Sequence, residues 1–337
     1  MDNAFYRTLF DRAYENTETM LAYTRASILI KSGHMSIKTP RWPVAILDIG
    51  SNTIRLAVYD HSNPKKAFFN EKVTCFLGHD LVRTGRLNPE AKKSAHHAVA
   101  GFMHITKALG CGSVHALATA AIRDARDGKR FVESLRRDLK VPIKIISGEQ
   151  EARYSALGVL SHIRDAEGMV ADLGGGSLEL ARIGSGHVYE TLTFPMGTLR
   201  LLNHGRSLPQ MIEEHLEGLS DHSCANLPLY VVGGTARAIA TVDSQIKDKS
   251  SKFKSYCMSR SDLLAFLKKI QKMQPDKIVR EFNISPVRAR ALPYACLLFT
   301  QIMKKLGSSR LIITTRGLRD GYLFSLIKGQ KIKKFYS

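Results

Sequence analysis

Two stretches of this sequence follow one plan. In "AILDIGSNTIRLAVYD" an apolar strand leads into Asp48, an apolar residue, a glycine and small polar residues, and a second apolar strand follows. The stretch "MVADLGGGSLELARIG" repeats this order around Asp172, 124 residues later. That spacing is close to the size of one domain. The repeat therefore predicts two related α/β domains, each built around a strand, a polar turn and a second strand.

Strands and helices are expected to alternate from residue 44 onward. The chain has 337 residues, of which 44% are hydrophobic, so it can bury the cores of two domains. Such alternation is typical of α/β architecture, in which helices cover the sheets. Residues 1–40 are a polar extension to which we assign no function. We expect strands near 44–48, 54–59, 67–76, 114–118, 143–146, 169–173, 178–183, 187–193, 229–232 and 311–314, and helices near 89–109, 128–139, 149–161, 209–218, 235–242, 261–273, 286–306 and 318–328.

The net charge of +20 is concentrated toward the C-terminus, since residues 241–337 hold 21 Lys and Arg against 6 Asp and Glu. Such a surplus is typical either of a solvated face or of a surface for nucleic acid, anionic lipid or a phosphate polymer. No apolar run is long enough to span a membrane and the start lacks a signal-peptide pattern, so we expect a cytoplasmic protein without membrane contact. Five scattered cysteines argue against a disulfide framework and against a zinc site.

The glycine-rich turns of both units favour an anion site. Glycine admits positive φ and lets a ligand approach the backbone without meeting a Cβ atom. Three consecutive glycines exceed what a hairpin needs, although a merely flexible tip is the alternative. A third turn, in "LYVVGGTARAIA", joins a strand to a helix start, which also suits an anion. The candidate phosphate-binding residues in these turns are Ser51, Asn52, Thr53, Gly174, Gly175, Gly176, Ser177, Gly234 and Thr235.

Asp48 and Asp172 come at corresponding points, where a strand ends beside each turn. A carboxylate next to a phosphate site repels the ligand unless a divalent cation lies between them, and Mg²⁺ prefers oxygen ligands. The alternative is that each aspartate caps its own turn through local hydrogen bonds. We take the matched pair as candidate ligands for Mg²⁺ (or Mn²⁺).

Two further residues are candidates for catalysis and phosphate binding. The stretch "IKIISGEQEARYSALGVL" begins a helix with Glu151 in its first turn. Acids are common there for structural reasons, because the helix dipole favours them by about 0.3–1 kcal/mol. Glu151 lies off the apolar stripe of this helix, so it could act as a general base if the phosphate site is close. Arg123, in "ALATAAIRDARDG", suits bidentate phosphate binding or an ordinary ion pair.

Seven motifs, in order and spacing, resemble those of the exopolyphosphatase/guanosine pentaphosphate phosphohydrolase family. They are "ILDIGSNTIRLAV", "ATAAIRDA", "ISGEQEARYSALGV", "VADLGGGSLEL", "MGTLRL", "VVGGTARAIA" and "GLRDGYL". The resemblance implies duplicated ribonuclease-H-like domains of the actin, sugar-kinase and heat-shock chaperone ATPase superfamily, with the active site in the interdomain cleft. It implies a first actin-like domain at 41–149 and a second at 150–318, with a C-terminal helix near 319–330 that packs back on the first.

The resemblance also implies roles for individual residues. Glu151 matches the glutamate that activates a water for in-line attack on the terminal phosphorus, and Mg²⁺ near the two aspartates would neutralise phosphate oxygens. Arg55 and Arg123 match basic positions that face the substrate.

Two departures from the family pattern stand out. Gln150 occupies a position at which relatives often carry a second acid, which puts its support of a metal or water in doubt. Only a short segment follows Leu323, so the chain resembles the short two-domain form that lacks an additional helical domain.

These observations predict an enzyme that hydrolyses the terminal phosphoanhydride of inorganic polyphosphate, guanosine pentaphosphate or both. A sugar-type kinase of the same superfamily and a sensor that binds without turnover are the alternatives. We expect nucleic acid not to be a partner and leave a homodimer open. The basic surplus favours polyphosphate, with Lys252, Lys254, Lys268 and Lys269 expected along the track of a long chain.

Overall fold

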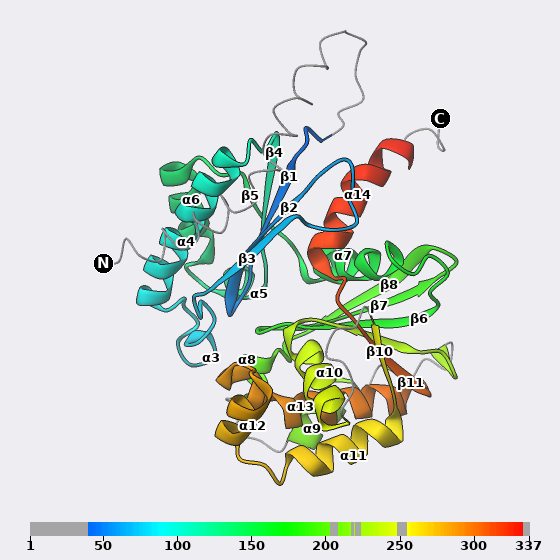
Figure 1. Cartoon of the computed structure of the whole chain (residues 1–337). Helices are drawn as coiled ribbons and strands as arrows, with labels where there is room; N and C mark the ends of the chain where they lie inside the picture. The colour runs from blue at the N-terminus through cyan, green and yellow to red at the C-terminus, as the bar shows by residue number, and fades with distance from the viewer. Residues whose placement is uncertain (1–39, 203–207, 217–218, 220–223, 248–254, 333–337) are drawn as a thin grey trace.

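The computed structural model describes residues 40–202, 208–216, 219, 224–247 and 255–332, so the extension predicted at residues 1–40 lies almost wholly outside the described residues. The strands form two mixed sheets (Figure 1). In the first, of order β3-β2-β1-β4-β5, strand β1 lies antiparallel to β2 and parallel to β4. Its strands are β1 (Val44–Ile49), β2 (Thr53–Tyr59), β3 (Phe69–Thr74), β4 (Ser113–Ala118) and β5 (Ile143–Ile145).

The second sheet repeats this plan in the order β10-β11-β9-β6-β7-β8, with β6 antiparallel to β7 and parallel to β9. Asp48 pairs with Arg55 across the first hairpin, and Asp172 pairs with Glu179 at the corresponding place in the second. The matching plans and registers confirm the predicted duplicated α/β fold. The strands are β6 (Gly168–Leu173), β7 (Leu178–Gly184), β8 (His187–Phe194), β9 (Leu229–Val232), β10 (Ser255–Ser259) and β11 (Arg310–Thr314).

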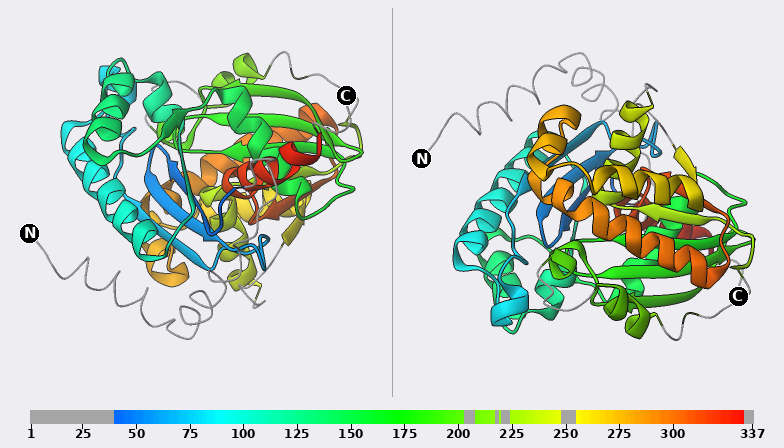
Figure 2. Two further views of the ribbon diagram at one scale, coloured as in Figure 1. Left: turned by 90° about the horizontal axis from the view of Figure 1, so that it is seen from above. Right: turned by 90° about the horizontal axis from the view of Figure 1, so that it is seen from below.

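Helices cover both faces of each sheet, which is why the central strands read as continuous apolar runs. Ala45 and Leu47 of β1 face α4 and α6, whereas Val44 and Ile46 face α14 on the other side. On the second sheet α7 covers one face, and α10, α11 and α13 cover the other (Figure 2). These helices are α4 (Pro89–Ala108), α6 (Gly128–Leu139), α7 (Gly148–Leu160), α10 (Gly234–Ile246), α11 (Arg260–Ile270), α13 (Pro286–Leu306) and α14 (Leu318–Ile332).

Helices α7 and α14 cross in close contact and connect the two sheets. α7 packs on the second sheet, and α14 packs both on the first sheet and on α7. A methyl group at Gly158 would collide with the carbonyl group of Gly317, and one at Gly321 would collide with the carbonyl group of Tyr154. Glycine is therefore needed at this crossing, because no Cβ atom fits between the two backbones.

Most expected elements occur within a few residues of their predicted positions, including α9 (Leu208–His215). The sequence reading missed β10 and the short helices α3 (Leu81–Thr84), α5 (Ala120–Asp124), α8 (Thr198–Leu202) and α12 (Pro275–Phe282). None of these is long enough to display a clear period of apolar residues. Within the described ranges, no helix has the length and apolar character that a membrane crossing demands.

Candidate active site

A cavity of about 630 Å³ lies where the two Asp-Gly hairpins and the start of α10 meet. Both predicted metal ligands, Asp48 and Asp172, line it, and so does Glu151. The structure therefore brings together segments that are far apart in the sequence. The predicted phosphate-binding residues that line the cavity are Ser51, Asn52, Thr53, Arg55, Gly174, Gly175, Gly176, Ser177, Gly234 and Thr235.

The glycines of the second hairpin allow the two hairpins to touch. A methyl group on Gly175 would lie 2.9 Å from the Cβ atom of Ser51. One on Gly176 would lie 2.8 Å from both the Ser51 hydroxyl oxygen and the Ala120 Cβ atom. Positive φ occurs at neither glycine, nor at Gly174. Gly175 and Gly176 are thus required for close approach of the hairpins, and not because the turn needs a positive φ.

The third glycine turn joins β9 to α10 beside Asp172. Gly233 has a φ of 103°, in the left-handed region that side chains disfavour. A methyl group there would lie 3.2 Å from Asp172 Oδ1. No side chain caps the start of α10, where Gly234 and Thr235 line the cavity. Unpaired N–H groups of a helix start can receive phosphate oxygens.

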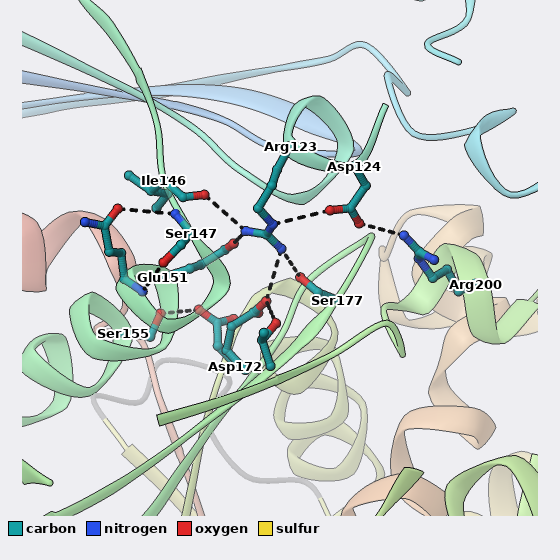
Figure 3. Close-up of polar contacts among 12 residues, drawn as sticks. Arg123, Asp124, Ile146, Ser147, Glu151, Ser155, Asp172, Ser177 and Arg200 are labelled. Carbon is teal, nitrogen blue, oxygen red and sulfur yellow. Dashed lines mark hydrogen bonds and ion pairs between the residues drawn. The ribbon is translucent and has the colours of Figure 1, made fainter. Parts of the chain in front are cut away.

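The two aspartates face one cavity and repel one another. Burial raises the pKa of Asp48, and the opposite charges of Arg319 and Arg55 oppose that rise. Burial also raises the pKa of Asp172; a hydrogen bond donated by the Ser155 hydroxyl opposes this, and the charge of Asp48 adds to it (Figure 3). A divalent cation would relieve this repulsion, and carboxylate oxygens with space for water and phosphate suit Mg²⁺. Among the described residues, no group of three or more His, Cys, Asp or Glu side chains is placed to hold a metal ion. An ion between the two aspartates would therefore take water or phosphate oxygens as its other ligands.

Glu151 lies in the first turn of α7, and its side chain keeps only 11% of its surface exposed. Burial raises the pKa of Glu151 to about 7; Arg123 opposes the rise, and Asp172 and Asp48 add to it. Glu151 Oε2 accepts a hydrogen bond from Arg123 Nη1 at 2.8 Å (Figure 3). A carboxylate with a pKa near neutrality can take up and release a proton in neutral solution, as a general base must.

Gln150 has a structural role at the start of α7. Its backbone N–H donates to the Ser147 hydroxyl, and its side-chain oxygen accepts from the Ser147 backbone N–H, both at 3.2 Å. This reciprocal pair is a capping box. Because Gln150 does not line the cavity, an amide in place of an acid removes no ligand from it.

Arg123 lies behind Glu151 and does not line the cavity, although we expected it to face the substrate. Its guanidinium donates to Glu151, to the Ile146 carbonyl oxygen at 3.4 Å and to the Ser177 hydroxyl at 3.5 Å. It also lies 3.3 Å from Asp124, which in turn pairs with Arg200 (Figure 3). In this geometry Arg123 orients and electrostatically stabilises the Glu151 carboxylate.

Glu179 is a buried acid at the site that the sequence reading missed. It lies on β7 opposite Asp172 and is 1% exposed. Burial holds the pKa of Glu179 well above its ordinary value, and the charges of Glu151 and Asp172 add to this effect. Thr193 donates a hydrogen bond to its Oε1 atom at 3.3 Å, whereas Oε2 has no partner among the described atoms. An acid inside the apolar stretch "SLELARI" was the available signal.

A group of cations also lines the cavity. Burial, together with the charges of neighbouring arginines, lowers the pKa of Arg237 to about 9 and that of Arg55 to about 10. Burial and nearby arginines also lower the pKa of Lys72. Buried cations that repel one another favour binding of a polyanion. The members that the sequence reading left without a role are Lys72, Arg237, Arg288, Arg290 and Arg319.

Comparison with known proteins identifies the family of this chain. Residues 57–330 match the model of the Ppx/GppA phosphatase family. The chain is 27% identical to Exopolyphosphatase 1 of Mycobacterium leprae over 212 residues. This aligned region covers 59% of this chain and 61% of the relative. It is 26% identical to the guanosine-5'-triphosphate,3'-diphosphate pyrophosphatase of Aliivibrio fischeri over 298 residues. This aligned region covers 84% of this chain and 59% of the relative. The chain thus spans roughly three fifths of the length of these curated relatives.

Solved structures share the arrangement of the two sheets. An exopolyphosphatase from Cytophaga hutchinsonii superposes with a TM-score of 0.78 at 21% identity, covering 85% of this chain and 98% of that one. The Aquifex aeolicus member of the Ppx/GppA family gives a TM-score of 0.73 at 22% identity, covering 87% of this chain and 99% of that one. These similarities establish the fold. Together with the family model, which matches most of the sequence, they lead to one conclusion: the chain belongs to the Ppx/GppA phosphatase family.

Proposed function

We propose that this chain hydrolyses the terminal phosphoanhydride bond of inorganic polyphosphate or guanosine pentaphosphate and releases orthophosphate. The observation that carries the proposal is Glu151, a buried carboxylate with a pKa of about 7 on the wall of an arginine-rich cavity. A base of this pKa suits proton removal from water. The surrounding arginines suit a substrate that carries several negative charges.

In the proposed reaction the two hairpins and the start of α10 hold the terminal phosphate. Glu151 takes a proton from a water while the oxygen of that water forms a bond to the terminal phosphorus. The bond between this phosphorus and the bridging oxygen breaks, and the bridging oxygen leaves with the electron pair. The cavity cations stabilise the charge that develops on the leaving phosphate. Such transfers depend mainly on positioning and charge stabilisation.

Asp48 and Asp172 would hold the Mg²⁺ (or Mn²⁺) ion. The fit rests on their shared cavity and on the repulsion that raises the pKa of Asp172. A bound divalent ion supplies positive charge to the phosphate oxygens during the transfer. Ser155 orients Asp172 through the hydrogen bond from its hydroxyl.

A second cavity favours guanosine pentaphosphate as a substrate. It has a volume of about 1080 Å³ and shares Thr74, Phe76, Val287 and Arg290 with the catalytic cavity. Among its described wall residues Arg290 is the one Lys or Arg; apolar and amide side chains make up most of the wall. Phe76 lines both cavities and is 40% exposed, so its ring is open to a ligand at their junction. A nucleoside suits this wall better than a continuing phosphate chain does.

The expected lysine track does not strengthen the case for polyphosphate. Lys252 and Lys254 lie outside the described residues. Lys268 and Lys269, in the last turn of α11, line neither of these two cavities. Support for a long-chain substrate therefore has to come from another surface.

Initial rates of phosphate release from tripolyphosphate, long-chain polyphosphate and guanosine pentaphosphate, measured with Mg²⁺, test the proposal. We expect release from at least one substrate and its loss in Glu151→Gln. Phe76→Ala should raise KM for guanosine pentaphosphate and leave KM for tripolyphosphate unchanged. Binding without release from any of the three would favour a sensor, and sugar-dependent formation of ADP from ATP would favour a kinase.

A further inference from the structure

A basic groove lies on the outer side of α4 and α6, apart from the catalytic cavity. These helices run side by side over the first sheet (Figure 2), and the groove between them has a volume of about 690 Å³. Its lining positions follow the helical period, so each helix turns one face toward it. They are 89, 92, 93, 96 and 97 on α4, and 130, 131 and 134 on α6, with 127 at the cap of α6.

Permanent cations dominate the groove. Arg86, Lys92, Lys93 and Arg130 line it together with a single carboxylate, Asp127. That carboxylate accepts hydrogen bonds from Lys92 Nζ at 2.8 Å and from a backbone N–H at 3.0 Å. Although burial opposes ionisation, these bonds hold the pKa of Asp127 below its usual range. Asp127 and Lys92 therefore form the structural base of the groove, and the other three cations remain available to a ligand.

The three other cations are weakly compensated. Lys93 lies 2.9 Å from Glu90, but the two side chains are 70% and 78% exposed, and such pairs contribute little. Neither Arg86 nor Arg130 forms an ion pair with a carboxylate of the described residues. A multiply charged anion can therefore bind all three without displacing a buried partner.

The lining favours a plain phosphate chain over nucleic acid. Binding of single-stranded nucleic acid commonly uses exposed aromatic rings on which bases stack. Phe131, the one Phe, Tyr or Trp in this groove, is 7% exposed and belongs to the core beneath it. The opposite side of the same part of α4 lines the large cavity that opens from the catalytic site, through Ala91 and Ser94. The start of α4 thus lies between the groove and the large cavity, with one face of the helix turned toward each.

We propose that the α4–α6 groove is a second binding site for polyphosphate, one that holds part of a long chain away from the catalytic cavity. This proposal depends on the proposed function in one respect only, namely that the bound polyanion is polyphosphate. We expect the catalytic cavity alone to hold short substrates, so the groove should affect only long polyphosphate.

The test compares two triple variants of equal charge. The groove variant carries Arg86→Gln, Lys93→Gln and Arg130→Gln. The control carries Lys66→Gln, Lys107→Gln and Lys144→Gln, three exposed lysines that line none of the three cavities described above. Affinity for end-labelled long-chain polyphosphate is measured by fluorescence anisotropy in EDTA over a range of salt concentrations, and KM and kcat are measured separately on long chains and on tripolyphosphate.

Each phosphate contact contributes about 0.7 to the slope of log affinity against log salt for a flexible polyanion, so losing three contacts should flatten the slope by about 2. The groove variant should show this change and a higher KM for long chains, with tripolyphosphate kinetics unchanged. Equal slopes in the two variants would overturn the proposal. A second anisotropy titration uses labelled single-stranded DNA, and a groove variant that loses affinity for this DNA but keeps its affinity for polyphosphate would overturn the proposal too. The binding measurement stands even if no substrate is hydrolysed, so failure of the proposed function remains distinguishable.

Discussion

Replacing Arg123 by glutamine should move the pH dependence of catalysis rather than abolish activity. Arg123 donates to Glu151 at 2.8 Å and does not line the catalytic cavity. Its positive charge favours the ionised form of Glu151, whose pKa is about 7 because burial outweighs this attraction. Without the cation, burial and the charges of Asp172 and Asp48 remain, so the pKa of Glu151 must rise.

The size of the change follows from the proximity of the pair. An opposite charge within about 4–6 Å moves a carboxyl pKa by about 1–3 pH units. In Arg123→Gln the pKa of Glu151 should therefore rise from about 7 to about 8–10. At pH 7 about half of Glu151 is ionised in the native chain, whereas in the variant the ionised share falls to about a tenth or to as little as a thousandth. A general base acts in its ionised form, so kcat/KM at pH 7 should fall by about fivefold to several hundredfold and recover as the pH rises.

The assay is the pH profile of kcat/KM on tripolyphosphate for three variants. Arg123→Lys keeps the charge but loses the planar fork, so its acid limb should move less than that of Arg123→Gln. Arg200→Gln is the matched control, because Arg200 pairs with Asp124 and, among the described residues, forms no hydrogen bond or ion pair with Glu151. Its acid limb should stay at the native position.

A uniform loss of rate at every pH, with the acid limb unmoved, would refute this reasoning. That result would mean that Arg123 acts on the substrate directly, as the family resemblance suggested. Circular dichroism of each variant would establish that a loss of rate is not a loss of fold.

Four further outcomes follow from the same geometry. Glu151→Gln should lower kcat at least about 100-fold with polyphosphate binding retained, while the exposed Glu149→Gln should be far milder. The melting temperature of Glu151→Gln should exceed that of the native chain at pH 8. The pKa of Glu151 is about 7 in the folded chain and 4.5 in the unfolded chain, so this carboxyl lowers the stability of the native chain as the pH rises between these values. Below about pH 4.5 the difference in melting temperature should vanish. Loss of an outer-shell partner alone costs about 10–100-fold in metal affinity, so Asp172→Asn, which alters a proposed ligand, should raise the Mg²⁺ concentration for half-maximal activity at least about 10-fold, with weaker Mn²⁺ binding in equilibrium dialysis. Gly176→Ala should cost about 1–3 kcal/mol in urea unfolding and most of the activity, whereas Gly174→Ala, whose methyl group would meet only a carbonyl oxygen at 3.4 Å, should be tolerated.

The parts of the site that sequence predicts are those encoded locally. A strand that ends in Asp and a glycine turn specify where a carboxylate and a polar hairpin lie, and the repeat of this unit specifies that two such hairpins exist. The sequence also carried a signal that we did not use. Ser147 and Gln150 have the spacing of a capping box, which predicts that Gln150 folds back on its own helix and faces no ligand.

The cations escaped prediction because they come from separate elements. Arg237 lies on α10, Arg288 on α13 and Arg319 on α14, and only the packing of these helices in the folded chain brings them to one wall. Residue type alone also could not place Arg123. An arginine suits a phosphate and a carboxylate equally well, and the choice depends on Glu151, which lies 28 residues away in sequence and adjacent in space.

The duplicated hairpins use one backbone plan to create two different electrostatic environments. Opposite Asp48 the return strand carries Arg55, and opposite Asp172 it carries Glu179. Arg55 lowers the pKa of Asp48, whereas Glu151 and Asp172 both raise the pKa of Glu179. The second hairpin thus places a carboxylate across from its aspartate, and the first hairpin places a cation there. The reaction that we propose needs fields of opposite sign within one cavity, for proton removal and for charge stabilisation, and the two return strands contribute one charge of each sign beside it.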